Sequence, residues 1–148
     1  MAIEQFKATA HLKQGTQVKV SSRGFELTLD EPVEEGGTDL GMNPVEALLG
    51  ALGACQAIVA RVYAKRFKVQ LDDFWVELEG DLDSDGYMDK ADVRCGYSAI
   101  RYTYHIKSPS AQADIDAFVA FIGGKCPVGD SLAQGVDLQL VGVVQEQC

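Results

Sequence analysis

The chain has 148 residues, of which 47% are hydrophobic and 24% charged, a composition typical of one globular domain. Its 22 acidic and 13 basic residues give a net charge of -9, and the bases form no cluster that would neutralise a row of phosphates, so we expect no nucleic-acid partner. The chain opens without a secretory leader, and its longest uncharged apolar stretch, residues 47–60, is too short to cross a bilayer. We therefore predict a cytoplasmic protein with no membrane partner.

Three short antiparallel strands are predicted near the N-terminus, because apolar and polar residues alternate there. The alternating apolar residues are Phe6, Ala8, Ala10 and Leu12, then Val18 and Val20, then Phe25, Leu27 and Leu29. Gly15 and the pair Arg23-Gly24 mark the two turns. The acidic segment 30–40 has no periodicity, so we expect a surface loop there and no domain boundary.

A long helix is predicted from Pro44 to about Arg66. Asn43, Pro44 and Glu46 have the residue types and spacing of a helix start that resembles a capping box. Apolar residues cover most of the helical circumference, so we expect this helix to be buried nearly all round at the centre of the fold. These residues are Leu48, Leu49, Leu52, Ile58, Val59 and Val62.

The second half of the chain is predicted to form two strands, two helices and a last strand. The strands are residues 69–82 and 93–106, joined by a turn at 83–86. A helix at 111–122 is capped by Ser110, a short helix covers 127–134, and residues 136–144 form the last strand. Tyr97, Tyr102 and Tyr104 are interpreted as aromatics packed on the sheet, with the lining of an apolar pocket as the alternative for some of them. This order predicts an α+β fold with mainly antiparallel sheets, in a single domain, 1–148.

The four cysteines, at positions 55, 95, 126 and 148, are the residues best suited to carry chemistry. They form no C-x-x-C motif, so we expect neither a metal site nor a cofactor. Cys55 lies in an apolar helix, where an unreactive core thiol is the usual interpretation. Cys126 precedes Pro127 at a helix start, where free N–H groups favour a thiolate, and reactive and inert interpretations are equally open for it. We interpret Cys95 and Cys148 as inert.

Three segments resemble the OsmC/Ohr family of osmotically inducible and organic-hydroperoxide-resistance proteins. Gly41-Met42-Asn43-Pro44, Glu46 and the run from Leu48 to Cys55 are similar to the family's helix with the peroxidatic cysteine. Cys126-Pro127-Val128 followed by Leu132-Ala133 resembles the second-cysteine segment, and Ser22-Arg23-Gly24 followed by Asp30-Glu31-Pro32 resembles the N-terminal strands. The resemblance implies an OsmC-like fold, with sheets wrapped around the central helix, and an intertwined homodimer with two sites at the subunit interface.

The resemblance also implies a thiol peroxidase that reduces organic hydroperoxides, with hydrogen peroxide as a further candidate substrate. Cys55 would attack the O–O bond and become a sulfenic acid, which Cys126 would convert to an intramolecular disulfide. An external dithiol would then reduce this disulfide. Arg23 would hold Cys55 as a thiolate and stabilise charge on the peroxide oxygens.

Glu46 has two open interpretations, because the hydroperoxide-resistance members place the acid that partners the arginine directly after the proline, where this chain has Val45. Nine residues separate Glu46 from Cys55, a rotation of about 900° that puts them on opposite helix faces. Glu46 thus either caps the helix or pairs with Arg23. The departure favours an alternative function, a dimeric small-molecule-binding or redox-sensing protein with little peroxidase activity.

Overall fold

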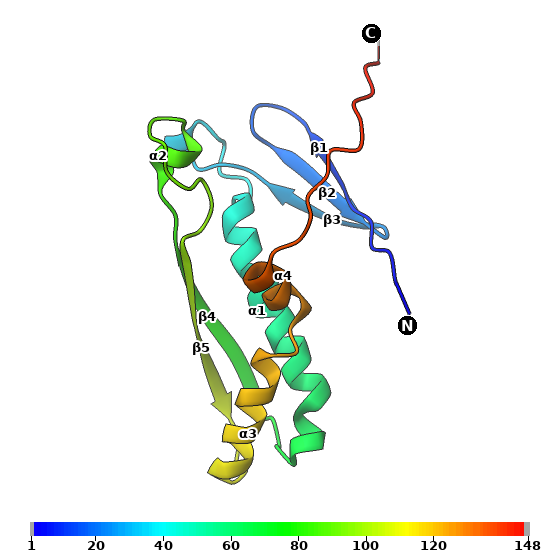
Figure 1. Ribbon diagram of the computed structural model, residues 1–148, viewed down its shortest axis with the longest axis vertical. Coiled ribbons are helices and arrows are strands. Elements are labelled where there is room, and N and C mark those ends of the chain that lie inside the picture. Colours follow the sequence, from blue (N-terminus) through cyan, green and yellow to red (C-terminus); the bar gives the residue numbers. More distant parts are fainter. Residues whose placement is uncertain (1, 147–148) are drawn as a thin grey trace. The chain divides into compact units, whose positions relative to one another are not determined.

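The computed structural model describes residues 2–146 and is drawn in Figure 1. The chain divides into two compact units. The first consists of the residues up to Ala51 together with Leu78–Tyr102, and the second of Leu52–Glu77 together with the residues from Thr103 onward. The expectation that residues 1–148 act as one domain stays a prediction.

The first unit contains the predicted N-terminal sheet. Its strands are β1 (Thr9–Leu12), β2 (Val18–Ser22) and β3 (Phe25–Leu29), which pair antiparallel in the order β1-β2-β3. Arg23 and Gly24 join β2 to β3, and both have positive φ, at 52° and 86°. A two-residue hairpin turn with both central residues left-handed matches the twist of the flanking strands. The three strands predicted from alternation are confirmed.

A buried carboxylate orders the segment after β3, which includes the short helix η1 (Val33–Glu35). Asp30 is 1% exposed and accepts hydrogen bonds from the hydroxyls of Thr16 at 2.6 Å and Thr38 at 2.5 Å. The backbone N–H groups of Glu31 and Leu40 donate to the same carboxylate. These hydrogen bonds, led by those from the two threonines, hold the pKa of Asp30 well below its usual range. The Asp30 carboxylate therefore links the beginning of the predicted surface loop 30–40 to its end.

Helix α1 (Pro44–Tyr63) begins with the predicted capping box and is continued by η2 (Ala64–Phe67). The Asn43 side chain accepts the Glu46 N–H at 2.9 Å, and the Glu46 carboxylate accepts the Asn43 N–H at 2.8 Å. These two bonds satisfy backbone donors that a helix start leaves unpaired. The capping part of the prediction is confirmed.

The prediction that α1 is buried nearly all round is wrong for the single chain. Its buried residues form one face, made of Leu52, Gly53, Gln56, Val59 and Ala60. Ile58 and Val62, on other faces, are 65% and 66% exposed. By length and composition alone, the 24 residues 44–67 would suffice to cross a membrane, although the uncharged stretch 47–60 within them is shorter. The same composition is typical of a core helix whose outer faces are covered by another protein surface.

Strands β4 (Asp73–Asp81) and β5 (Ala99–Lys107) form a two-stranded sheet. It is antiparallel, because Lys107 accepts the Asp72 N–H at one end and Asp81 accepts the Ser98 N–H at the other. The connection is longer than the predicted turn, since α2 (Ser84–Tyr87) and residues 88–98 precede β5. Cys95 therefore lies in this connection and is exposed, so placing it in a strand was wrong.

The core of the second unit lies between the second half of α1 and α3 (Gln112–Gly123), which runs beside it in Figure 1. Its buried residues are Val59, Ala60, Ala64, Val69, Leu71, Phe118 and Ile122. The predicted cap of α3 is wrong. Ala111 is the N-cap, and the Ser110 hydroxyl instead accepts the Gln70 N–H at 2.8 Å.

The chain continues from α3 into α4 (Pro127–Gln134), which ends at Gly135 as predicted. The last strand predicted at 136–144 is absent from the described residues, and no strand follows α4 up to residue 146. Its apolar side chains are 83–95% exposed from Leu138 onward, namely Leu138, Leu140, Val141, Val143 and Val144. Alternation predicts a strand only where a neighbouring strand is present to pair with it.

Candidate active site

Cys55 and Cys126 are brought together in the second unit, although they lie 71 positions apart in the sequence. Cys55 lies on α1, and Cys126 is the residue that begins α4. Their side chains are hydrogen-bonded to each other, and both are free thiols. Cys126 is 2% exposed, whereas Cys55 is half-buried. A molecule that approaches this pair from solvent therefore reaches Cys55 first, and Cys126 lies behind it.

Cys126 is the N-cap of α4, as the Cys-Pro pair predicts. Its sulfur accepts the N–H of Gly129 at 3.2 Å. Burial nevertheless raises the pKa of the Cys126 thiol, and the hydrogen bond with Cys55 raises it further, while the N–H groups of Gly129 and Val128 lower it less. Burial of Cys126 thus opposes the thiolate that the helix start favours, and its effect on the pKa is the larger one.

The first turn of α4 packs against α1 beside the sulfur pair. A side-chain carbon placed on Gly129 would lie 3.5 Å from both the Cys126 sulfur and Leu52 Cδ1, which is ordinary van der Waals contact. Leu52 is buried and lies three residues before Cys55 on α1. The wall next to Cys126 is therefore apolar, which accounts for the desolvation of its thiol.

Gln56, which follows Cys55, is a polar residue of this region that the sequence analysis did not single out. It is 2% exposed, and its Oε1 has no hydrogen-bond partner among the residues the structure describes. The available signal was a carboxamide in an otherwise apolar helical run. Buried carboxamides ordinarily have partners for their oxygen, so this one requires an explanation.

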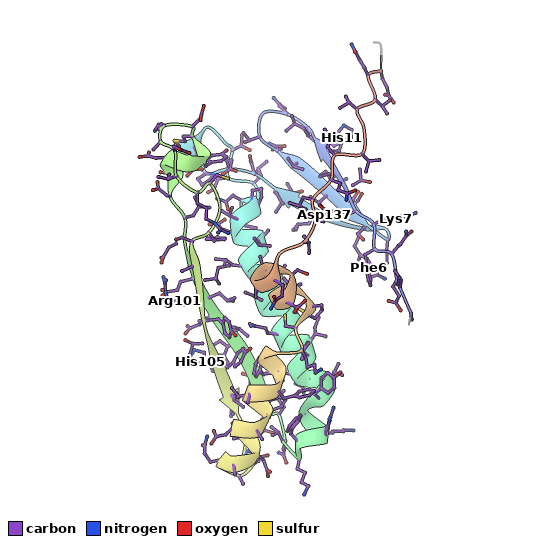
Figure 2. All side chains as sticks on the ribbon, viewed as in Figure 1. Phe6, Lys7, His11, Arg101, His105 and Asp137 are labelled. Carbon is purple, nitrogen blue, oxygen red and sulfur yellow. The ribbon has the colours of Figure 1, made fainter. Side chains whose placement is uncertain are left out.

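Arg23 lies in the first unit, at the turn between β2 and β3. Its guanidinium carbon is 5.4 Å from the centre of the Phe25 ring, within the range of a cation–π contact. A groove adjoins it, and one of its lining residues, Lys7, is labelled in Figure 2. The groove is lined by Lys7, Ala8, Thr9, Ser21, Ser22, Arg23, Gly24 and Glu26. The role of Arg23 toward Cys55 stays a prediction.

Glu46 also lies in the first unit, where it acts in the capping box described above. No ion pair joins it to Arg23 within residues 2–146. Its neighbour Val45 is held by Tyr97, whose hydroxyl donates to the Val45 carbonyl at 2.9 Å. Burial raises the pKa of Tyr97, and the charge of Glu46 adds to this effect. Tyr97 therefore fastens the connection before β5 to the first turn of α1.

Two polar side chains of β5, Arg101 and His105, are labelled in Figure 2. Arg101 bonds the carboxylates of Glu79 and Asp81, each with a nitrogen–oxygen distance of 2.6 Å. The Nε2 of His105 lies 2.7 Å from a Glu77 carboxylate oxygen. These are cross-strand pairs of an exposed sheet face. No group of three His, Cys, Asp or Glu residues suited to a metal ion occurs among the described residues.

The comparison with known proteins finds relatives along most of the chain. The family described as OsmC-like protein matches residues 36–141. A hydroperoxide reductase of Mycoplasma pneumoniae is 27% identical over 143 residues, 95% of this chain and 94% of the relative. One of Mycoplasma genitalium is 26% identical over 132 residues, 87% of each chain.

Solved structures show the same fold. The OsmC-like protein of Mycoplasma pneumoniae superposes with a TM-score of 0.78 at 27% identity, over 90% of this chain and 89% of that one. The organic hydroperoxide resistance protein OsmC of Legionella pneumophila gives 0.67 at 25% identity, over 93% and 95%. The predicted α+β fold, with antiparallel sheets and a central helix, is confirmed. The protein belongs to the OsmC-like family.

Proposed function

We propose that this protein is a thiol peroxidase that reduces organic hydroperoxides through Cys55 and Cys126. The observation that carries the proposal is the hydrogen bond between the side chains of the buried Cys126 and the half-buried Cys55. Relatives named hydroperoxide reductases, 26% and 27% identical over most of the chain, support a peroxide-related function. Because the identity to these relatives is low, the proposed mechanism rests on this chain's own residues.

The reaction begins with the Cys55 thiolate attacking the terminal, hydrogen-bearing oxygen of the hydroperoxide. A sulfur–oxygen bond forms, the O–O bond breaks, and the leaving alkoxide takes a proton to become an alcohol. Cys55 is then a sulfenic acid. Cys126 attacks its sulfur, the hydroxide leaves, and the proton of the Cys126 thiol completes a water molecule. The raised pKa of Cys126 keeps its proton in place until the sulfenic acid has formed.

Recycling needs two electrons, which an external dithiol supplies by thiol–disulfide exchange. A second copy of the chain would complete the enzyme. The outer faces of α1 and the residues after Gly135 present exposed apolar side chains, such as Ile58, Val62 and Leu138. A large exposed apolar surface favours burial against another protein surface. Arg23 would supply the positive charge for the departing oxygen.

The alternative is a small-molecule-binding or redox-sensing protein with little peroxidase activity. It is favoured by Val45 at the position where the resemblance implies an acid, and by the use of Glu46 in the capping box. In this case the two cysteines would change oxidation state slowly or not at all with organic hydroperoxides.

One experiment separates the two functions. The reduced protein is mixed with one equivalent of cumene hydroperoxide, quenched with an alkylating agent and analysed by intact mass and peptide mapping. A loss of two hydrogens within seconds, mapped to a Cys55–Cys126 bond and absent from Cys55→Ser, is the expected result. Two alkylated thiols after minutes would reject the peroxidase and favour the alternative.

A further inference from the structure

Two cations of the second unit, Arg66 and Lys125, share one aromatic ring. The guanidinium carbon of Arg66 lies 5.0 Å from the centre of the Phe121 ring, and the Nζ of Lys125 lies 5.7 Å from the same centre. Neither cation forms an ion pair with any described residue, whereas Lys19 and Arg101 do pair with carboxylates. A cation–π contact holds a charge in place without cancelling it. The two cations therefore leave a local excess of positive charge in a chain whose acids outnumber its bases by 22 to 13.

This cation pair lies close to the redox cysteines, because Lys125 directly precedes Cys126. The Gly124 N–H donates to the Phe121 carbonyl and the Lys125 N–H to the Ile122 carbonyl, so the chain stays tightly wound from α3 to the residue before Cys126. In Figure 1 the end of α3 leads straight into α4. One residue and one lysine side chain together span about 10 Å, so the Lys125 ammonium lies within that distance of the Cys126 backbone. This is roughly the range over which charges act on one another at physiological salt.

The reductant is the molecule of the proposed cycle that such charges would attract. Its attacking group is a thiolate, and it must approach a protein with a net charge of -9, which repels anions. Positive charges next to the disulfide offset that repulsion locally. Because Cys126 is buried and Cys55 half-buried, a small molecule reaches their disulfide more readily than the surface of a folded protein does.

We propose that Arg66 and Lys125 attract the reductant of the Cys55–Cys126 disulfide, and that this reductant is a small dithiol with an acidic group. One thiolate of the reductant attacks the Cys55 sulfur, the bond between the cysteines breaks, and Cys126 leaves with the electron pair and takes up a proton. The second thiol of the reductant loses its proton to solvent and attacks the first sulfur of the reductant. Cys55 is released as a thiolate, and the reductant leaves as a cyclic disulfide. This inference rests on the proposed peroxidase function and names the chemical class of its reductant.

The test measures how the charge of a thiol changes its attack on the disulfide. The Cys55–Cys126 disulfide is made with diamide and located by peptide mapping, so the measurement does not depend on peroxide turnover. The probes are mercaptoethanesulfonate and mercaptoethanol, which carry the same thiol on the same two-carbon chain and differ in the sulfonate. The loss of the disulfide at low salt is followed by alkylation and mass analysis, and each rate is divided by the thiolate concentration. The ratio of the sulfonate rate to the alcohol rate reports the preference for an anion.

Removing both charges should lower this ratio. For Arg66→Gln/Lys125→Gln we expect a ratio about threefold below that of the parent, with the mercaptoethanol rate unchanged, because two charges near the disulfide act on the anion alone. Arg66→Lys/Lys125→Arg keeps both charges and should keep the ratio. Lys13→Gln/Lys90→Gln removes two exposed charges from the first unit, alters the net charge equally and should also match the parent. Added salt should abolish the difference between the parent and Arg66→Gln/Lys125→Gln.

Three results would overturn the inference. An unchanged ratio in Arg66→Gln/Lys125→Gln would leave the two side chains as a cover of the Phe121 ring. A mercaptoethanol rate that falls together with the sulfonate rate would mean that access to the disulfide had changed. If the double variant does not fold, Lys125→Gln is measured alone, and an unchanged ratio there would have the same meaning. The proposed function fails separately, when the reduced parent forms no disulfide with cumene hydroperoxide although the ratio still depends on the two cations.

Discussion

The side chains of Cys126 and Cys55 are hydrogen-bonded to each other, and burial raises the pKa of the Cys126 thiol. The two sulfurs are thus held close together in the reduced protein, with Cys126 the more buried of the two. Contact between the thiols removes most of the movement that disulfide formation would otherwise need. The first prediction follows from this division between an accessible and a buried sulfur.

Replacing Cys126 with Ser should leave the attack on peroxide intact and block the second step. We expect Cys55 to accumulate as sulfenic acid and, with excess hydroperoxide, to proceed to sulfinic acid. Mass analysis should find additions of one and then two oxygens on the Cys55 peptide, with no disulfide. Cys95→Ser, in the exposed connection before β5, is the control and should form the disulfide normally. A disulfide to Cys95 in the Cys126→Ser protein would contradict the assigned pair.

Asp30→Asn should lower the thermal stability, because Thr16 and Thr38 lose a charged acceptor that binds both hydroxyls. We expect a Tm lower by roughly 5 °C, measured by circular dichroism at neutral pH. Asp92→Asn, an exposed acid in the connection before β5, should change the Tm little. Equal changes in Tm for Asp30→Asn and Asp92→Asn would show that the hydrogen bonds to the Asp30 carboxylate do not stabilise the fold.

The same carboxylate predicts a pH dependence. The pKa of Asp30 is lowered in the folded protein, so its stabilisation is fully present above the unfolded value near 4 and is lost as the pH falls toward the folded pKa. The Tm of the parent should therefore decrease on acidification below about pH 4 more steeply than that of Asp30→Asn. Parallel Tm curves for the two proteins would reject this assignment.

Gly80→Ala should disturb the contact between Tyr97 and α1. A side-chain carbon at Gly80 would lie 2.5 Å from Tyr97 Cε1, so the ring must move and its hydroxyl must leave the Val45 carbonyl. We expect a Tm decrease of several degrees, larger than that of Tyr97→Phe, which loses only the hydrogen bond. Gly96→Ala, whose added carbon meets nothing closer than 3.9 Å, is the control. An unchanged Tm for Gly80→Ala would show that the position of the Tyr97 ring does not contribute to stability.

A homodimer should be measurable by light scattering as a mass twice the 16.0 kDa of one chain. Ile58→Glu places a charge on an exposed apolar position of α1, where a partner surface would bury it. We expect this substitution to shift the protein toward monomer, whereas Gln134→Glu, at an exposed polar position, should leave the mass unchanged. A monomeric parent would refute the proposal of a second copy.

Much of the local structure follows from the sequence, since its causes lie within a few residues. The capping box pairs Asn43 with Glu46, three residues away, and the turn at Arg23-Gly24 needs only two left-handed residues. Cys126 at the start of α4 follows likewise from the Pro127 beside it. The resemblance to the OsmC-like family was also recognised from short segments, and the family match over residues 36–141 confirms this resemblance.

Only the tertiary structure decided what depends on distant neighbours. Ser110 has the side chain of a cap, but the Gln70 N–H, 40 residues away, takes its hydroxyl. The pattern at 136–144 predicts a strand, yet a strand forms only beside another one. The contact between Cys55 and Cys126 and the desolvation of Cys126 result from packing α4 onto α1. Backbone preferences are local, whereas burial and hydrogen-bond partners depend on the whole fold. The environment of the two sulfurs could therefore be described only from the tertiary structure.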